Sequence, residues 1–143
     1  MYDLKTIKQK VLSLRILIVD DEEAILKGTT VFMKKFCNQV DTAKNGEDAL
    51  KKFKEDGPYD IVLTDVRMPK MSGWKLIEAL KDIDTEFFSA VMTGSPDIDG
   101  VFKSKCDMFM AKPVDIYNMK RMMEMIICIW KTCGRIHYIK QCS

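Results

Sequence analysis

The chain has 143 residues, of which 47% are hydrophobic and 31% are charged, and its formal net charge is +2. This length and composition are typical of one globular domain with its own core, and they exclude disordered and fibrous proteins. The small charge does not indicate nucleic-acid binding, and no apolar run approaches the ~20 residues of a membrane span, so we expect a cytoplasmic protein that contacts neither nucleic acid nor membrane directly.

The first part of the chain alternates strand-like and helix-like patterns. Residues 16–19 are a β-branched run that ends at two aspartates, which predicts a buried strand, and residues 40–43 predict a weaker strand. Residues 22–36, between them, have apolar side chains at helical spacing. Four side chains share one stripe of this predicted helix: Ile25, Thr29, Phe32 and Phe36.

The middle of the chain repeats this alternation. Asn45-Gly46 predicts a turn, and the short helix that follows should end near Gly57-Pro58, since glycine and proline interrupt helices. Residues 61–64 then form a second strongly apolar run that ends at an aspartate. This run predicts another buried strand.

Three more elements follow a loop over residues 68–73. Residues 74–80 predict a helix with Ile77 and Leu80 turned inward, and residues 88–93 predict a strand. A short helix is expected over 97–105, although Gly100 weakens it.

The last strand and the last helix close the pattern. Residues 108–111 predict a strand, and a long helix follows that should end at Gly134. Five residues define its predicted inward stripe: Ile116, Met119, Met123, Ile126 and Trp130. Four further apolar residues fall off that stripe: Tyr117, Met122, Met125 and Ile129. A helix that is apolar all round needs a second burial partner.

Five predicted strands alternating with five predicted helices indicate an α/β fold with a parallel sheet, in which the chemistry lies at the carboxyl ends of the strands. Asp20 and Asp21 follow the first strand, Asp65 ends the third, Thr93 ends the fourth and Lys112 ends the fifth. Three gathered carboxylates repel one another unless a cation binds, and oxygen ligands suit Mg²⁺ or Mn²⁺. A lysine and a hydroxyl beside such a metal indicate a phosphoryl group, with a carboxylate as nucleophile.

Four motifs resemble the receiver domain of bacterial two-component response regulators: VDDEEAIL (19–26), LTDVRMPKMSG (63–73), VMTG (91–94) and FMAKPV (109–114). The resemblance implies a flavodoxin-like three-layer sandwich, with a five-stranded parallel sheet in the order 2-1-3-4-5 and five helices. It divides the chain into an N-terminal extension (1–14), a receiver domain (15–133) and a C-terminal tail (134–143).

The resemblance also implies a metal site and a phosphoacceptor. Asp65 matches the residue that accepts the phosphoryl group. Asp21 and Asp65, with the backbone carbonyl of Arg67, match the direct ligands of Mg²⁺, for which Mn²⁺ is an alternative. Asp20 matches the acid that usually holds this metal through water.

Five further roles concern the phosphoryl group. Lys112 matches the lysine that bridges to it, Thr93 matches the hydroxyl that swings towards it, and Phe109 matches the aromatic switch. Arg67 and Ser95 lie where the family tunes the lifetime of the phosphoryl group, although ordinary loop polarity explains both residues equally well.

The implied function is a phosphorylation-dependent signalling switch of a two-component phosphorelay. It takes its phosphoryl group from a phosphohistidine of a sensor histidine kinase or a histidine phosphotransfer domain, and it catalyses only its own phosphorylation and dephosphorylation. One alternative is an interaction module that is never phosphorylated, which the complete set of site residues disfavours. Another is a Mg²⁺-dependent phosphohydrolase, which generally needs a second acid where this chain has Arg67.

Three features depart from the family pattern. The stretch from Thr93 to Lys112 is short by nearly one helical turn, so the helix over 97–105 should be reduced. Residues 1–14 have heptad-like apolar spacing and form either a short added helix or a frayed tail. Only about ten residues follow the last helix, so we expect a single-domain regulator or an excised receiver. We expect a downstream target, or a second copy of the chain, to bind the face formed by residues 97–130. The alternative is that the N-terminal segment covers this face within the same chain, through Leu4, Ile7 and Val11.

Overall fold

A computed structural model describes residues 14–94, 106–112 and 115–133. Its strands are β1 (Arg15–Val19), β2 (Gln39–Ala43), β3 (Ile61–Asp65), β4 (Phe88–Thr93) and β5 (Met108–Ala111). Its helices are α2 (Glu23–Met33), α3 (Gly46–Asp56), α4 (Gly73–Ile83) and α6 (Ile116–Cys133). The strands form one parallel sheet in the order β2-β1-β3-β4-β5, which confirms the predicted fold.

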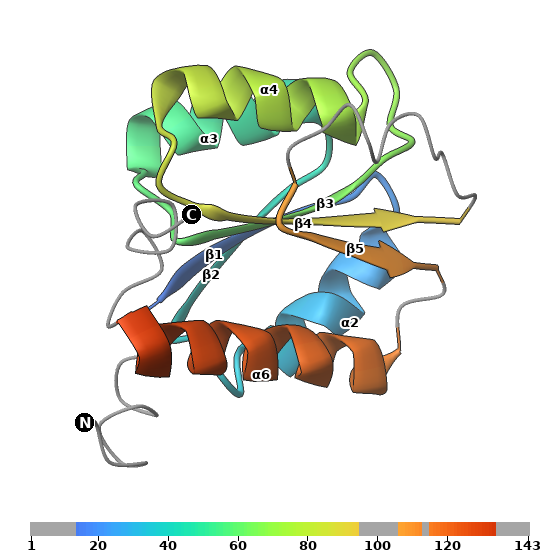
Figure 1. Ribbon diagram of the computed structural model, residues 1–143. Coiled ribbons are helices and arrows are strands. Elements are labelled where there is room, and N and C mark those ends of the chain that lie inside the picture. Colours follow the sequence, from blue (N-terminus) through green and yellow to red (C-terminus); the bar gives the residue numbers. More distant parts are fainter. Residues whose placement is uncertain (1–13, 95–105, 113–114, 134–143) are drawn as a thin grey trace.

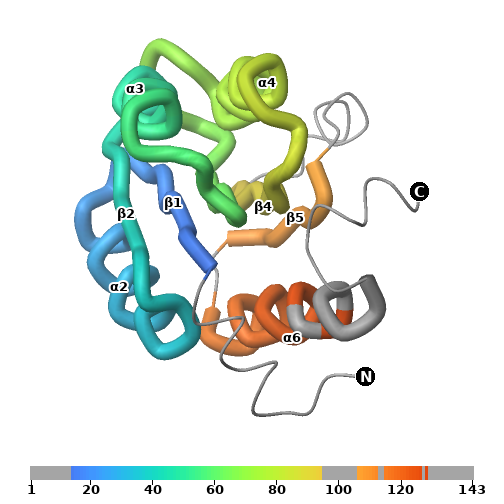
Figure 2. Tube along the Cα trace, turned by 90° about the vertical axis from the view of Figure 1, so that its left-hand side faces the viewer, coloured from blue at the N-terminus to red at the C-terminus, as the bar shows by residue number. Residues whose placement is uncertain are grey.

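The sheet is the middle of three layers. Helices α3 and α4 cover one face and helices α2 and α6 cover the other, as Figure 1 and the rotated view in Figure 2 show. Successive strand residues point to opposite faces. In β1, Ile16 and Ile18 therefore join the core beneath α2 and α6, whereas Leu17 and Val19 join the core beneath α3 and α4. Burial on both faces explains why these strands read as continuous apolar runs.

Some predicted elements lie outside the described residues. They are the helix over 97–105, the helix or tail within residues 1–13 and the helix end at Gly134. Within the described part of the chain, no helix is long and apolar enough to cross a membrane.

The predicted turn at Asn45-Gly46 is wrong, because these residues begin α3. The Asn45 side chain accepts a hydrogen bond from the backbone N–H of Asp48 at 2.8 Å, and Gly46 is the first residue of the helix. Asparagine favours turns and helix N-caps for the same reason, since its short side chain bonds to nearby backbone. The dipeptide pattern could not separate the two.

Helix α2 is shorter than predicted and its buried stripe is turned slightly. Thr29 and Phe32 are buried as expected, but Ile25 and Phe36 are only half-buried. The helix ends at Met33, and the next turn directs Cys37 into the core, where its backbone N–H donates to the Met33 carbonyl at 2.8 Å.

Helix α6 buries a different set of methionines from the one predicted. Met119, Met123 and Ile126 are buried as expected, but Ile116 is 63% exposed and Met122 is fully buried. The seam that faces the sheet therefore runs i, i+3, i+4, i+7 from Met119, and Ile116 precedes it by one turn. Met122 no longer argues for a second apolar face on this helix.

Candidate functional site

The register of the sheet brings the predicted site residues to one edge. Val19 pairs with Thr64 across β1 and β3, so that Asp20 and Asp65, the next residue of each strand path, are neighbours. Asp65 pairs with Met92, and Thr93 pairs with Ala111, the last residue of β5. Lys112 follows directly, and its backbone N–H donates to the Thr93 carbonyl at 2.7 Å.

Three carboxylates form an acidic cluster at this edge. Asp20, Asp21 and Asp65 each offer one oxygen, and these oxygens all lie within 4.8 Å of one another. Asp20 and Asp65 are buried, with 0% and 5% of their surface exposed, whereas Asp21 is exposed. Hard oxygen donors at such separations, open to solvent on one side, fit Mg²⁺ or Mn²⁺.

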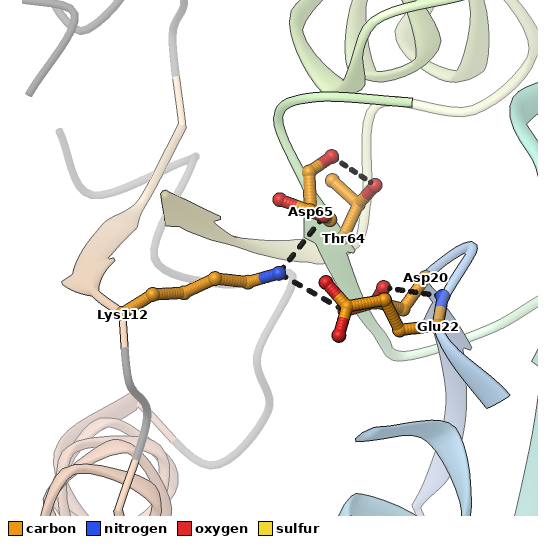
Figure 3. Close-up of polar contacts among 5 residues, drawn as sticks. All are labelled: Asp20, Glu22, Thr64, Asp65 and Lys112. Atoms are coloured by element: carbon orange, nitrogen blue, oxygen red, sulfur yellow. Dashed lines mark hydrogen bonds and ion pairs between the residues drawn. The ribbon is translucent and has the colours of Figure 1, made fainter. Parts of the chain in front are cut away.

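Lys112 reaches from the end of β5 into the acidic cluster, as Figure 3 shows. Its Nζ lies 2.9 Å from Asp65 Oδ2 and 3.3 Å from Asp20 Oδ2. The other oxygen of Asp20 accepts a hydrogen bond from the backbone N–H of Glu22 at 2.9 Å. One cation thus serves two buried carboxylates, which leaves the cluster with an excess of negative charge.

The electrostatics of the site follow from this geometry. Burial raises the pKa of Asp20, and Asp65 adds to the effect, although the Glu22 N–H and Lys112 oppose it. Burial works to lower the pKa of Lys112, but its hydrogen bonds and charge interactions with Asp65 and Asp20 outweigh burial and raise this pKa. The lysine is therefore held in its charged form, while the ionised Asp20 is held at a cost that a bound cation would relieve.

The backbone around Asp65 is packed too closely for a side chain at the start of α4. A Cβ at Gly73 would lie 2.2 Å from the Asp65 carbonyl oxygen, and the Gly73 N–H donates to the Val66 carbonyl at 2.8 Å. The Thr64 hydroxyl also donates to the Asp65 carbonyl, at 2.9 Å. Gly73 is the last residue of the motif LTDVRMPKMSG, but its role depends on this close approach, which no local pattern shows.

The structure also describes three of the four other predicted site residues. Thr93 is buried at the end of β4, on the same edge as Asp65, and Phe109 is half-buried on β5, three residues before Lys112. Arg67 is an exposed loop residue two positions after Asp65. Ser95 lies outside the described residues, so that its predicted role stays a prediction.

A family model and two curated relatives match most of this chain. The sequence matches the family described as the response regulator receiver domain over residues 16–124. The two-component response regulator ARR11 of Arabidopsis thaliana is 36% identical over 112 residues, which cover 75% of this chain and 21% of that protein. The regulatory protein AtoC of Escherichia coli (strain K12) is 28% identical over 130 residues, or 89% of this chain and 28% of that protein.

Solved structures agree with the fold. A response regulator receiver domain protein from Clostridium thermocellum superposes with a TM-score of 0.74 at 26% identity, covering 84% of this chain and 98% of that chain. A CheY-like receiver domain protein from Methanospirillum hungatei JF-1 gives a TM-score of 0.75 at 24% identity, covering 84% and 98%. The chain spans about a fifth of the length of the curated relatives ARR11 and ARR12.

Proposed function

Because the chain belongs to the response regulator receiver domain family, we propose that it is a phosphorylation-dependent signalling switch with Asp65 as the phosphoacceptor. Receiver domains are regulatory phosphoacceptors rather than conventional enzymes, which disfavours the phosphohydrolase alternative. The observation that carries the proposal is the position of Asp65, which is 2.9 Å from the Lys112 ammonium and within the acidic cluster.

The acidic cluster is the proposed site of Mg²⁺, with Mn²⁺ as the alternative. Asp21 and Asp65 would bind the ion directly together with the backbone carbonyl of Arg67, and Asp20 would hold it through water. When bound, the ion supplies positive charge that offsets the carboxylates and the phosphoryl oxygens.

Phosphoryl transfer to Asp65 requires a positioned carboxylate and positive charge around the transferred oxygens. An oxygen of Asp65 attacks the phosphorus of a phosphohistidine, the P–N bond breaks, and its electron pair stays on the imidazole nitrogen. The product is an aspartyl phosphate. Lys112 would then donate to a phosphoryl oxygen instead of the carboxylate, and the hydroxyl of Thr93 would move to another.

The switch itself would be a two-state rearrangement around Thr93. When its hydroxyl turns towards the phosphoryl group, the space behind it becomes available to the half-buried ring of Phe109. Arg67 and Ser95 would adjust the lifetime of the phosphorylated state. The output would pass through the face formed by residues 97–130, to a downstream protein or a second copy of the chain.

The donor would be a sensor histidine kinase or a histidine phosphotransfer domain. A small phosphodonor can replace it in a test, because receiver domains supply the catalytic groups themselves. We expect the protein to gain the mass of one phosphoryl group when it is incubated with phosphoramidate and Mg²⁺. The Asp65→Asn variant should gain none, whereas Asp82→Asn, which changes an exposed carboxylate on α4, should react as the wild type does. An unchanged yield in Asp65→Asn would overturn the assignment.

A further inference from the structure

The loop between Asp65 and α4 is seated on the first turn of α3, and we propose that the contact of Met71 with Gly46 positions this loop for metal binding. The inference rests on the proposed function, because the loop carries the Arg67 carbonyl. Met71 would be a positioning residue that acts through the backbone, and Gly46 would be the surface that receives it.

The contact is too close to admit a side chain at Gly46. A Cβ there would lie 2.8 Å from Met71 Sδ, 2.9 Å from its Cβ and 3.0 Å from its Cγ. Gly46 is buried, and the half-buried Met71 packs against the core beneath α3 and α4. The thioether side chain therefore lies directly on the backbone of α3.

After Val66, the loop has few other attachments among the described residues. Arg67, Pro69 and Lys70 are exposed, and Lys70 has a φ of 70°, in the left-handed region. Within the loop, the backbone N–H of Met71 donates to the Pro69 carbonyl at 2.8 Å. Of its other side chains, only that of Met68 packs against the same core. The loop is fixed at its first residue, the buried Val66, whose backbone N–H donates to the Met92 carbonyl at 3.0 Å and whose carbonyl accepts from the Gly73 N–H at 2.8 Å. Between Val66 and Gly73, the side chains of Met68 and Met71 hold the segment that presents the Arg67 carbonyl against this core.

The segment that contains Gly46 is also tied to the other half of the acidic cluster. The backbone N–H of Asp20 donates to the carbonyl of Ala43, at the end of β2, at 3.2 Å. Three residues later Gly46 receives Met71, and the Asn45 cap fixes the intervening backbone. One connection, from β2 to α3, therefore contacts the strand path of Asp20 and the loop that follows Asp65. This connection can therefore hold Asp20 and the loop after Asp65 in fixed positions relative to each other.

A side chain at residue 46 would disturb the loop rather than only the methionine. The Met71 Cβ is fixed to the backbone, so that a change of rotamer cannot move it away. Carbon atoms settle roughly 3.5–4.0 Å apart, whereas the two Cβ atoms would be 2.9 Å apart, so the loop backbone must shift by roughly 0.5–1 Å. Changes in the groups that orient metal ligands typically weaken metal affinity by about 10–100-fold.

The test compares two substitutions at opposite ends of α3. Gly46→Ala should weaken Mg²⁺ binding about 10-fold in a calorimetric titration of the folded protein. Gly57→Ala is the matched control, because its Cβ would lie 2.3 Å from the Phe53 carbonyl oxygen, far along the same helix. It should lower thermal stability and leave Mg²⁺ affinity within about twofold of the wild type.

Variants of the methionine separate positioning from folding. Met71→Ala should also weaken Mg²⁺ binding and should speed amide exchange over residues 66–73 in the absence of metal. Met71→Leu, which keeps the inner part of the side chain, should retain the affinity. These variants decide the matter even where Gly46→Ala fails to fold.

Three results would overturn the inference. Wild-type Mg²⁺ affinity in Gly46→Ala and in Met71→Ala would refute the positioning role and would leave the proposed function intact. An equal loss in Gly57→Ala would mean that general destabilisation explains the effect. A wild-type chain that binds no Mg²⁺ would refute the proposed function and this inference together.

Discussion

Replacing Lys112 by alanine removes the cation that serves two buried carboxylates. Its Nζ lies 2.9 Å from Asp65 and 3.3 Å from Asp20, and 17% of its side chain is exposed. At an effective dielectric constant of about 20, each contact contributes about 5 kcal/mol of Coulomb attraction before desolvation is counted. Removing one partner of a buried pair typically costs about 3–5 kcal/mol. We take about 3 kcal/mol, since solvent reaches part of the lysine.

The matched control is an ion pair of the same kind in solvent. Lys27 Nζ lies 3.5 Å from the Glu23 carboxylate, one turn away on α2, and both side chains are more than 70% exposed (77% and 74%). Lys27→Ala should change stability by less than about 0.5 kcal/mol. In a thermal melt without Mg²⁺ at pH 7, Lys112→Ala should therefore melt roughly 10 °C below Lys27→Ala.

The pH dependence of the Lys112→Ala variant follows from Asp20. Burial already raises the pKa of Asp20, and loss of the lysine removes a charge that opposes this rise. A carboxyl whose folded pKa lies above its unfolded pKa favours folding while it is protonated, and this contribution is lost as pH rises through the folded pKa. The stability deficit of Lys112→Ala relative to the wild type should therefore shrink as pH falls from 7 towards 4. Equal melting of the Lys112 and Lys27 variants, or a deficit that grows in acid, would refute this reasoning.

Three further predictions test other parts of the account. Asp20→Asn should melt above the wild type without Mg²⁺, because Lys112 keeps its shorter contact with Asp65 while the amide removes a charge that burial and Asp65 disfavour. Mg²⁺ should stabilise this variant less than the wild type in the same melt. Gly73→Ala should lose about 2 kcal/mol or more of folding stability and react slowly with phosphoramidate, because its Cβ would lie 2.2 Å from a backbone oxygen. Its control, Gly28→Ala on α2, has nothing within 4 Å of the new Cβ and should gain up to about 1 kcal/mol of folding stability. Equal melting temperatures of the two variants would contradict the steric argument. Burial raises the pKa of Cys37 to about 12. Iodoacetamide at pH 8 should therefore label Cys37 far more slowly than the exposed Cys128, as measured by peptide mapping. Equal labelling rates would show that Cys37 is not buried.

The three central strands, β1, β3 and β4, could be predicted from the sequence to within a residue or so, because they are buried on both faces. Ile61 to Leu63 are wholly apolar and lie in the middle of the sheet. Because the carboxyl ends of parallel strands share one edge of the sheet, the sequence also predicts that Asp20, Asp65 and Lys112 lie together. The fold family supplied the order of the strands.

The errors come from contacts that local patterns do not encode. Met122 and Ile116 both fit an apolar helix, and only the angle at which α6 lies on the sheet decides that the first is buried and the second exposed. The bridging of two carboxylates by Lys112 depends on the reach of one side chain. The seat of Met71 on Gly46 joins residues that are 25 positions apart, and glycine in a turn-like motif gives no sign of it.

The central claim is that Asp65 carries the phosphoryl group, and locating the modified residue tests it most directly. The protein is phosphorylated with phosphoramidate and Mg²⁺ and reduced with borohydride, which converts an aspartyl phosphate to homoserine, and its peptides are then sequenced by mass spectrometry. The account predicts homoserine at residue 65, and none when Mg²⁺ is replaced by a chelator. Homoserine at Asp20 or Asp21, or an unreduced phosphate on a hydroxyl or histidine side chain, would contradict it.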